Sequence, residues 1–231
     1  MILFDYGDTL LCEPGFDTLR GNEALMKYAV SNPQKLSAKQ VNDFSGYLWE
    51  EFCGPIREIG AEFHNLNFQK LLYETLQLEF SVGNEELELI FWDNMSPGAK
   101  VPHVEEMLDY LREKNYRTGV ISNIGFSGKA LENRIGRLLP KHNFEFIIAS
   151  SEYMVRKPNP LIFKLALSKA DLTADEVWYC GNKPEFDVIG AHNAGIFPVW
   201  YRNDETDKPP CCELLRIDDW LEFIDILEEL K

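Results

Sequence analysis

The chain opens with an apolar run that leads directly into a polar turn. Residues 2–4 are Ile-Leu-Phe, and Asp5, Gly7 and Asp8 follow within the next four positions. A short apolar run bounded by turn residues is typical of a buried parallel strand. In an open α/β sheet such a strand brings the next residue to the carboxyl edge, where ligands bind. The pattern therefore predicts that Asp5 lies at the mouth of a site.

A helical pattern occupies the following segment. Apolar side chains recur there at steps of three and four residues, as on one face of an amphipathic helix; they include Val41, Phe44, Leu48, Trp49 and Phe52. We expect helices near residues 17–30, 67–77 and 85–93, with breaks at 32–33, 54–55 and 96–98, where prolines and glycines occur. This segment is predicted to be an all-helical insert.

From Val101 onward, predicted strands alternate with predicted helices. The strands are expected at 118–121, 146–149, 177–180 and 197–201, and the helices near 104–111, 160–169, 185–194 and 218–229. Such alternation is typical of right-handed βαβ units in a parallel sheet. The fold class is therefore α/β, with a core formed by residues 1–13 and 97–231 and an inserted helical domain at 14–96.

Composition and charge narrow the range of partners. The 231 residues are 45% hydrophobic and carry a formal net charge of −15. The chain is long enough for a core domain and a smaller second domain. Its negative charge repels phosphate-rich surfaces, so we expect neither nucleic acid nor an anionic membrane as a partner. A small phosphorylated molecule is compatible with this charge if the pocket is locally positive. The sequence does not indicate an oligomeric state.

Two further observations bear on location and metal binding. No apolar stretch reaches the roughly 20 residues of a membrane span, and the first strand begins at Ile2, so we expect a cytoplasmic protein without a signal sequence. The cysteines include no Cys-x-x-Cys pair, so we expect neither a zinc site nor a disulfide framework; they are Cys12, Cys53, Cys180, Cys211 and Cys212.

Polar residues follow three of the later predicted strands or open the helix after them. Ser122 and Asn123 end one strand, Lys157 lies in the segment Arg-Lys-Pro-Asn-Pro, and Asn182 to Asp187 follow another strand. Because the carboxyl ends of parallel strands meet at one edge, these residues can meet Asp5 there. One such residue alone is usually a turn or cap residue. Four signals in this order predict a shared site.

Together these four motifs resemble those of the haloacid dehalogenase-like hydrolase superfamily. The resemblance covers nearly the whole chain and implies a Rossmann-like core with a cap domain between the first two motifs. It implies that Asp5 attacks phosphorus to form an aspartyl-phosphate, that Ser122 holds a phosphoryl oxygen and that Lys157 offsets negative charge. Asn123 would contribute hydrogen-bond donors nearby, so Ser122, Asn123 and Lys157 are the expected substrate-binding residues.

The resemblance also implies a Mg²⁺ site. Its expected ligands are Asp5, the backbone carbonyl of Gly7, Asn182 and Asp187. Asn182 stands where relatives have an aspartate, and a neutral amide oxygen suits a hard cation less well than a carboxylate, so the metal site is expected to be weak. Lys183 follows directly; it is either an outward-facing loop residue or a partial replacement for the charge of the metal.

Gly7 is the second departure from the family's pattern. Relatives that are phosphatases carry there a second aspartate, which serves as general acid and base, and glycine has no proton to transfer. Asp8 is the nearest substitute, although it lies one residue further along. We therefore expect a phosphatase of a small phosphorylated metabolite with slow turnover and a non-standard proton source.

Two other functions are compatible with the sequence. One is a non-catalytic or regulatory binding protein that keeps this fold. The other is a dehalogenase-like hydrolase acting at carbon, for which Arg20 or Arg57 would be the halide ligand. The cap is expected to select the substrate, but its aromatic side chains are assigned to core packing by default; they are Phe44, Trp49, Phe63 and Tyr73.

Overall fold

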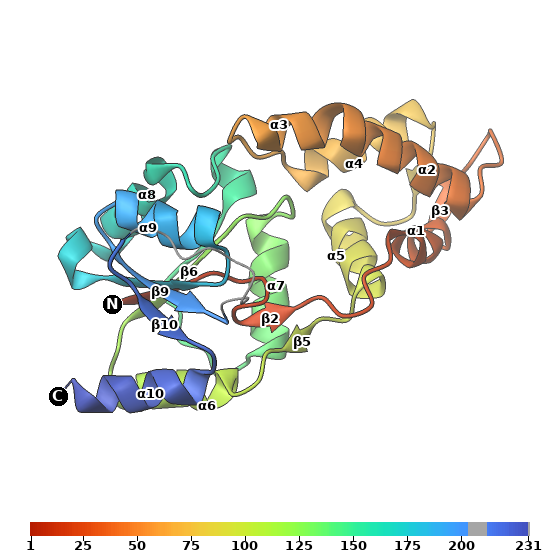
Figure 1. The fold of residues 1–231 in the computed structure, drawn as a ribbon. Coiled ribbons are helices and arrows are strands. Elements are labelled where there is room, and N and C mark those ends of the chain that lie inside the picture. Colours follow the sequence, from red (N-terminus) through yellow and green to blue (C-terminus); the bar gives the residue numbers. More distant parts are fainter. Residues whose placement is uncertain (203–211, 231) are drawn as a thin grey trace.

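The computed structural model describes residues 1–202 and 212–230. Its centre is a six-stranded sheet in the order β10-β9-β8-β1-β6-β7, with every neighbouring pair parallel (Figure 1). The strands are β1 (Ile2–Phe4), β6 (Thr118–Ser122), β7 (Ile147–Ala149), β8 (Trp178–Gly181), β9 (Phe197–Tyr201) and β10 (Leu215–Ile217). The predicted parallel α/β fold is therefore confirmed. The sequence analysis did not predict β10.

The two faces of the sheet are covered by different helices. Ile2 and Phe4 of β1 pack on one face with helices α6 (Val104–Glu113), α7 (Gly128–Leu138) and α10 (Trp220–Glu229). Leu3 packs on the other face with α8 (Pro160–Ala170) and α9 (Ile189–Asn193). Successive side chains of a strand point to opposite faces, and helices on both faces bury all three residues of β1.

The register of the central strands brings the carboxyl ends of β1, β6 and β8 to one level. Phe4 is paired with Val120 of β6 and with Cys180 of β8. The backbone N–H of Asp5 donates to the carbonyl of Cys180 at 2.8 Å. Asp5 therefore leaves the centre of the sheet at the edge where ligands bind in open parallel sheets.

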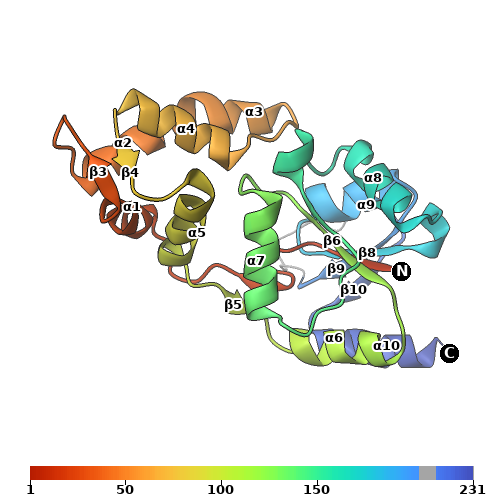
Figure 2. The ribbon, with the colours of Figure 1, turned by 180° about the vertical axis from the view of Figure 1, so that it is seen from behind.

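Residues 18–95 form a second group of elements at one end of the molecule, away from both labelled termini (Figures 1 and 2). These elements are α1 (Thr18–Met26), β3 (Ala29–Ser31), α2 (Ala38–Leu48), α3 (Gly54–Glu58), α4 (Asn65–Thr75), β4 (Glu79–Phe80) and α5 (Asn84–Met95). They bury a hydrophobic cluster of their own around Leu25, Leu72 and Leu87. Strands β2 (Leu11–Cys12) and β5 (Ala99–Lys100) pair where the chain passes between the two groups.

The insert differs from the prediction in three details. It is not entirely helical, because β3 and β4 form an antiparallel pair, and the helix predicted over 17–30 ends at Met26. The predicted break at 54–55 is also absent. A π-helical turn at Trp49–Cys53 joins α2 to α3, and Pro55 lies in the first turn of α3, where proline removes no needed hydrogen bond.

Two further observations concern the cysteines and the helices. Cys12, Cys53 and Cys180 are free thiols, and Cys211 lies outside the described residues. Within the described part of the chain, no helix has the length and apolar character needed to cross a membrane.

Candidate active site

Lys157 lies between the two carboxylates that the sequence motifs single out. Its Nζ donates hydrogen bonds of 2.6 Å to Oδ1 of Asp5, to Oδ1 of Asp187 and to the hydroxyl of Tyr179. The lysine side chain is 2% exposed. An ammonium group has three N–H donors, and here each of them points at an oxygen. Lys157 therefore offsets part of the negative charge of Asp5 and Asp187 and has no further donor for a phosphoryl group.

Burial and charge act in opposite directions on this cluster. Burial raises the pKa of Asp5 to about 6, although the charge of Lys157 opposes the rise, and the carboxylate of Asp187 adds to it. Burial by itself would lower the pKa of Lys157, but Asp187 and Asp5 outweigh that effect and raise it. Lys157 thus stays charged near neutral pH, while Asp5 becomes ionised in the weakly acidic range.

The position of Lys157 depends on Asn123. The side-chain amide of Asn123 donates to the backbone carbonyl of Lys157 at 2.9 Å and accepts from its backbone N–H at 2.7 Å. Both polar groups of the amide are therefore used to hold the lysine loop beside β6. Substrate binding by Asn123, expected from the sequence, remains a prediction; the contacts found here position Lys157.

Ser122 is the last residue of β6 and is one of the residues that line the central cavity. It is 2% exposed, and its hydroxyl has no hydrogen-bond partner among the described residues. A hydroxyl can both donate and accept. Ser122 is therefore available to a ligand in the cavity; that it binds substrate remains a prediction.

The fourth motif places Asp187 under Lys157 and keeps it there by close packing. Oδ2 of Asp187 accepts from the backbone N–H of Lys183 at 2.9 Å, and Oδ1 accepts from Lys157. A Cβ on Gly181 would lie 2.4 Å from Cγ of Asp187, so only glycine allows this approach. Lys183 is exposed and contributes its backbone N–H here. The cation between Asp5 and Asp187 is Lys157.

The predicted Mg²⁺ ligands form a set with little negative charge. Asp5, Gly7, Asn182 and Asp187 all line the cavity, but both carboxylate oxygens of Asp187 are already hydrogen-bonded. The side-chain oxygen of Asn182 accepts only a long, 3.5 Å bond from Thr9. No group of three His, Cys, Asp or Glu side chains suited to a metal occurs within the described ranges. Asp5, the Gly7 carbonyl and Asn182 thus fit a weak Mg²⁺ site with one carboxylate.

The turn after Asp5 has its unusual backbone conformation at Asp8. Asp8 has φ +56°, and its N–H donates to the carbonyl of Leu11 at 2.8 Å. Gly7 has no left-handed φ, and a Cβ built on it would meet no atom within 4 Å. Asp8 is exposed and lines the cavity. The chain therefore has space for a side chain at position 7, and the nearest carboxylic acid after Asp5 is that of Asp8.

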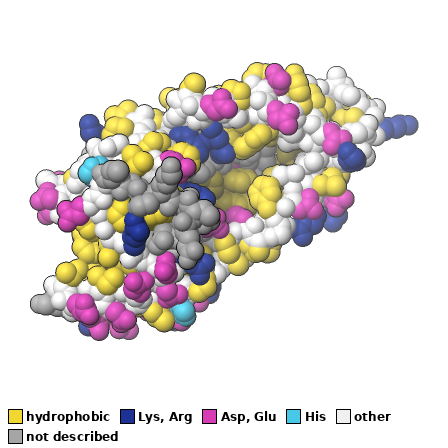
Figure 3. All heavy atoms as spheres, in the orientation of Figure 1, with side chains coloured by type: hydrophobic (Ala, Val, Ile, Leu, Met, Phe, Trp, Pro, Cys, Tyr) yellow, Lys and Arg dark blue, Asp and Glu magenta, His cyan; other side chains and the backbone are white. Residues whose placement is uncertain are grey.

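A cavity of about 780 Å³ lies between the sheet core and the insert. Figure 3 shows this face of the molecule hollowed between the two parts, with hydrophobic side chains in the hollow. The aromatic assignments made from sequence need a correction here, because Trp49 and Phe63 line the cavity. Phe44 and Tyr73 pack with the hydrophobic cluster of the insert, as expected.

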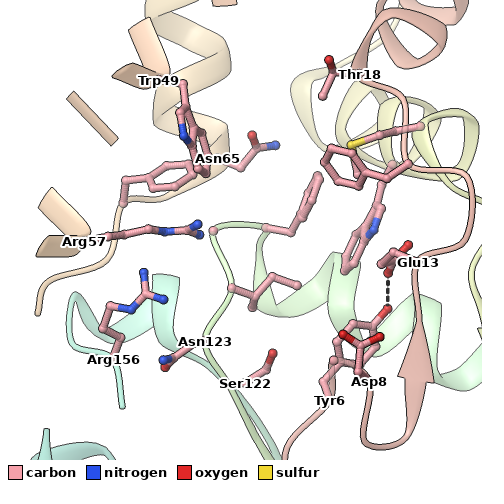
Figure 4. Close-up of a pocket in the computed structure, with 18 of the residues that line it drawn as sticks. Tyr6, Asp8, Glu13, Thr18, Trp49, Arg57, Asn65, Ser122, Asn123 and Arg156 are labelled. Atoms are coloured by element: carbon pink, nitrogen blue, oxygen red, sulfur yellow. Dashed lines mark hydrogen bonds between the residues drawn. The ribbon is translucent and has the colours of Figure 1, made fainter. Parts of the chain in front are cut away.

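Two arginines reach the same cavity from different parts of the fold. Arg57 comes from α3 in the insert, and Arg156 directly precedes Lys157 (Figure 4). From the sequence, Arg57 is considered only as a halide ligand, and Arg156 has no assigned role. The position of Arg156 beside Lys157 in the third motif is the signal that could have identified it. Arg20, the other halide candidate, is not among the cavity-lining residues and donates to the carbonyls of Gly15 and Met95.

Arg134 of α7 joins the turn that follows Asp5 to the two segments where the chain passes between core and insert. Its guanidinium donates to the hydroxyl of Tyr6 at 3.1 Å, to Glu13 at 2.5 Å, to Asp93 at 2.9 Å and to the carbonyl of Ser96 at 2.8 Å. The side chain is 2% exposed. Sequence reasoning missed both this arginine and its helix. Arg134 fixes the residue after Asp5 relative to the segments that connect core and insert.

Comparisons with known proteins identify the family that this chain resembles. The family described as "Haloacid dehalogenase-like hydrolase" matches residues 93–200. A glyceraldehyde 3-phosphate phosphatase of Pyrococcus abyssi is 31% identical over 205 residues, which are 87% of this chain and 81% of that protein. A phosphoserine phosphatase of Thermus thermophilus is 30% identical over 175 residues, 74% of this chain and 70% of that protein.

A solved structure supports the fold. The crystal structure of a 2-haloacid dehalogenase from Pseudomonas syringae has a TM-score of 0.68 and covers 100% of this chain and 98% of its own. Its sequence identity is 20%, so the likeness concerns the arrangement of the chain alone.

Proposed function

This chain belongs to the haloacid dehalogenase-like hydrolases, and on that basis we propose that it hydrolyses a small phosphorylated metabolite through an aspartyl-phosphate on Asp5. The observation that carries the proposal is the 2.6 Å contact between Asp5 and Lys157 beside a cavity that Ser122 also lines. Phosphoryl transfer depends mainly on positioning and on stabilising charge, and these three side chains supply both.

In the proposed reaction, a carboxylate oxygen of Asp5 attacks phosphorus and the bond from phosphorus to the ester oxygen breaks. The hydroxyl of Ser122 donates to a phosphoryl oxygen, and Lys157 balances the charge of the carboxylates. Water then attacks the phosphorus of the aspartyl-phosphate, which releases inorganic phosphate and restores Asp5. Overall, the ester and water give the alcohol and phosphate. Each of the two displacements is easier than a single direct attack of water on the ester.

The proton for the departing oxygen cannot come from position 7, because that residue is glycine. Asp8 or water supplies it in this proposal. General acid catalysis contributes about 10²–10⁴ in rate, so turnover of alkyl phosphates is expected to be slow. Esters of more acidic alcohols need less protonation of the leaving group, and we expect them to be hydrolysed faster.

A Mg²⁺ ion, if bound, would be held by Asp5, the carbonyl of Gly7 and Asn182. When bound it would offset negative charge on the phosphoryl group. Asp187 takes part by fixing Lys157, since both of its oxygens are hydrogen-bonded to other groups. The ammonium of Lys157 supplies part of the positive charge at the site whether or not the metal is present.

The test is hydrolysis of a panel of phosphate esters with and without Mg²⁺. The panel contains glyceraldehyde 3-phosphate, phosphoserine and a pyrimidine nucleotide, because similar proteins carry those names, together with an aryl phosphate that has an acidic leaving group. Asp5→Asn is expected to abolish turnover. Asp8→Asn makes the same chemical change three residues away and is the matched control for loss of charge in this turn.

The two variants separate the roles of the two carboxylates. If Asp8 supplies the proton, Asp8→Asn slows the alkyl esters more than the aryl ester; if water supplies it, both rates stay near those of the parent. Hydrolysis that survives Asp5→Asn, or no turnover of any ester, would contradict the proposal. The second result would favour a non-catalytic binding protein or hydrolysis at carbon, for which Arg57 in the cavity is the candidate halide ligand.

A further inference from the structure

Arg57 and Arg156 are separated by about a hundred residues, yet their guanidinium groups meet at one end of the cavity. Figure 4 shows both groups reaching inward, one from the insert and one from the core, on the side of the cavity that also holds Trp49 and Asn123. Arg57 is 26% exposed and Arg156 is 12% exposed. Two like charges with little contact with water need compensation.

The compensation within the protein is a single carboxylate. Glu62 has a fully buried side chain; its Oε1 accepts from Nε of Arg57 at 2.7 Å, and its Oε2 lies 3.3 Å from Nη1 of Arg156. The hydroxyl of Ser150 also donates to Oε2, at 3.1 Å. The group of Arg57, Arg156 and Glu62 therefore keeps a net charge of +1 at the cavity wall.

The two guanidinium groups also keep donors without acceptors. Arg57 uses Nε for Glu62, and its two terminal nitrogens have no hydrogen-bond partner among the described residues. Nη1 of Arg156 is buried without a hydrogen bond, although it is in ionic contact with Glu62. Burial lowers the pKa of Arg156, Glu62 opposes that effect, and the charge of Arg57 lowers the pKa further. The terminal nitrogens of Arg57 are unpaired but not fully buried, and Arg57 lines the cavity, so they are open to an anion there.

Aromatic rings fix the planes of both groups. Cζ of Arg57 lies 4.8 Å from the ring centre of Trp49 and 5.0 Å from that of Phe63. Cζ of Arg156 lies 5.8 Å from the ring centre of Phe186. Such packing limits the motion of a guanidinium while leaving its edge available for hydrogen bonds. The donors are therefore held in place before a ligand arrives.

We propose that Arg57 and Arg156 form a second anion site, so that the substrate carries a carboxylate or a second phosphoryl group besides the phosphoryl group that is removed. This inference rests on the proposed function for the first group. Because Arg57, Arg156 and Asp5 line the same cavity of about 780 Å³, one small molecule in that cavity can meet both sites. A guanidinium pair is suited to a planar carboxylate or a phosphoryl group, since both accept hydrogen bonds at two oxygens.

The proposal can be tested by binding without turnover. Titration calorimetry compares 3-phosphonopropionate with propylphosphonate, which has the same chain but lacks the carboxylate. We expect the parent to bind 3-phosphonopropionate about tenfold more tightly, the effect typical of hydrogen bonds between charged groups. Propane-1,3-diphosphonate tests the second phosphoryl group, and the tighter of the two dianionic probes identifies the preferred anion. Equal affinity of all three compounds would overturn the proposal.

Variants then locate the effect. Arg57→Gln and Arg156→Gln are expected to remove most of the tenfold preference, whereas Glu62→Gln should increase it because the site loses its internal anion. Lys39→Gln is the matched control: it removes one positive charge from the insert at a residue that does not line the cavity. Arg57→Lys keeps the charge beside Glu62 and serves if the glutamine variants do not fold. A preference that survives both arginine changes would refute the assignment.

These outcomes are independent of the phosphatase proposal. If no ester is hydrolysed but the preference for 3-phosphonopropionate depends on Arg57 and Arg156, the anion site stands and the proposed reaction fails. If esters are hydrolysed but the preference is absent, the reaction stands and the second site fails.

Discussion

Nζ of Lys157 lies 2.6 Å from Oδ1 of Asp5, and the same nitrogen lies 2.6 Å from Oδ1 of Asp187. One buried cation thus serves two carboxylates, one directly after β1 and one in the π-helical turn Pro184–Val188 that follows β8. The remaining N–H points at Tyr179, whose hydroxyl in turn donates to the carbonyl of Ile121 at 3.1 Å. Asp5, the nucleophile of the proposed reaction, is therefore held by a hydrogen-bond network in which every N–H of Lys157 has a partner.

Removing that cation should destabilise the protein. We expect Lys157→Met to lower the free energy of unfolding by about 3–5 kcal/mol, because Asp5 and Asp187 would be left buried and unpaired. Urea denaturation followed by circular dichroism measures the change. The double variant Lys157→Met/Asp187→Asn should recover part of the loss, since one of the two unpaired charges is gone. A single variant as stable as the parent would show that the network contributes nothing.

The pKa of Asp5 predicts an acid limit for activity. Burial raises this pKa to about 6, and only the ionised carboxylate attacks phosphorus. Below that pH we expect kcat/KM to fall about tenfold per pH unit as Asp5 becomes protonated. A pH profile of an ester that the parent hydrolyses measures the limit.

The substrate itself ionises with a pKa of about 6, so a control is needed. The carboxylate of Asp187 contributes to the raised pKa of Asp5. Asp187→Asn should therefore move the acid limit to lower pH, while the ionisation of the substrate stays unchanged. If the profiles of the two proteins coincide, the limit belongs to the substrate.

Position 7 offers a gain-of-function experiment. A side chain there would meet no atom within 4 Å and would point into a region bordered by the cavity. We expect Gly7→Asp to raise kcat for alkyl phosphates by about 10²-fold, because it adds a general acid. Gly7→Asn has the same shape without the proton and should give no such gain. Equal rates for the two variants would show that proton transfer does not limit turnover.

Position 182 tests the charge of the metal site. Asn182→Asp replaces a neutral oxygen by an anionic one beside Asp5 and Gly7, and carboxylates are the preferred ligands of Mg²⁺. We expect a clear decrease in the Mg²⁺ concentration that gives half-maximal activity. Calorimetric titration of Mg²⁺ provides a readout that does not depend on turnover. Unchanged affinity in the variant would exclude residue 182 as a ligand.

Alanine substitutions at two glycines should change the stability of the protein in opposite directions. At Gly181 a Cβ would lie 2.4 Å from Cγ of Asp187, so Gly181→Ala should destabilise by about 1–3 kcal/mol and shift Asp187 away from Lys157. Gly136 lies within α7, and a Cβ there would meet nothing within 4 Å. Gly136→Ala should stabilise by about 0.5–1 kcal/mol. Thermal unfolding of both variants checks the contrast.

Local patterns in the sequence predicted much of the core because they reflect local physics. The apolar run at residues 2–4 predicted a central parallel strand, because such a strand is buried on both faces. Asp5 follows it directly and was therefore expected at the ligand-binding edge. The same reasoning predicted β9 with its observed bounds. Helix α7 was overlooked although its buried residues Ala130, Leu131 and Ile135 recur at helical steps. Strand β3 was taken as part of a helix because its partner β4 lies about fifty residues away.

The sequence alone determined the order of the motifs, the parallel sheet and the position of Asp5, Ser122 and Lys157 at its carboxyl edge, because each depends on short-range periodicity and chain order. Only the tertiary structure decided which partners these groups have. It directed all three donors of Lys157 to oxygens, used the amide of Asn123 to hold the lysine backbone, and placed Arg57 beside Arg156. Such contacts join residues far apart in the chain, and their geometry depends on how the insert packs on the core.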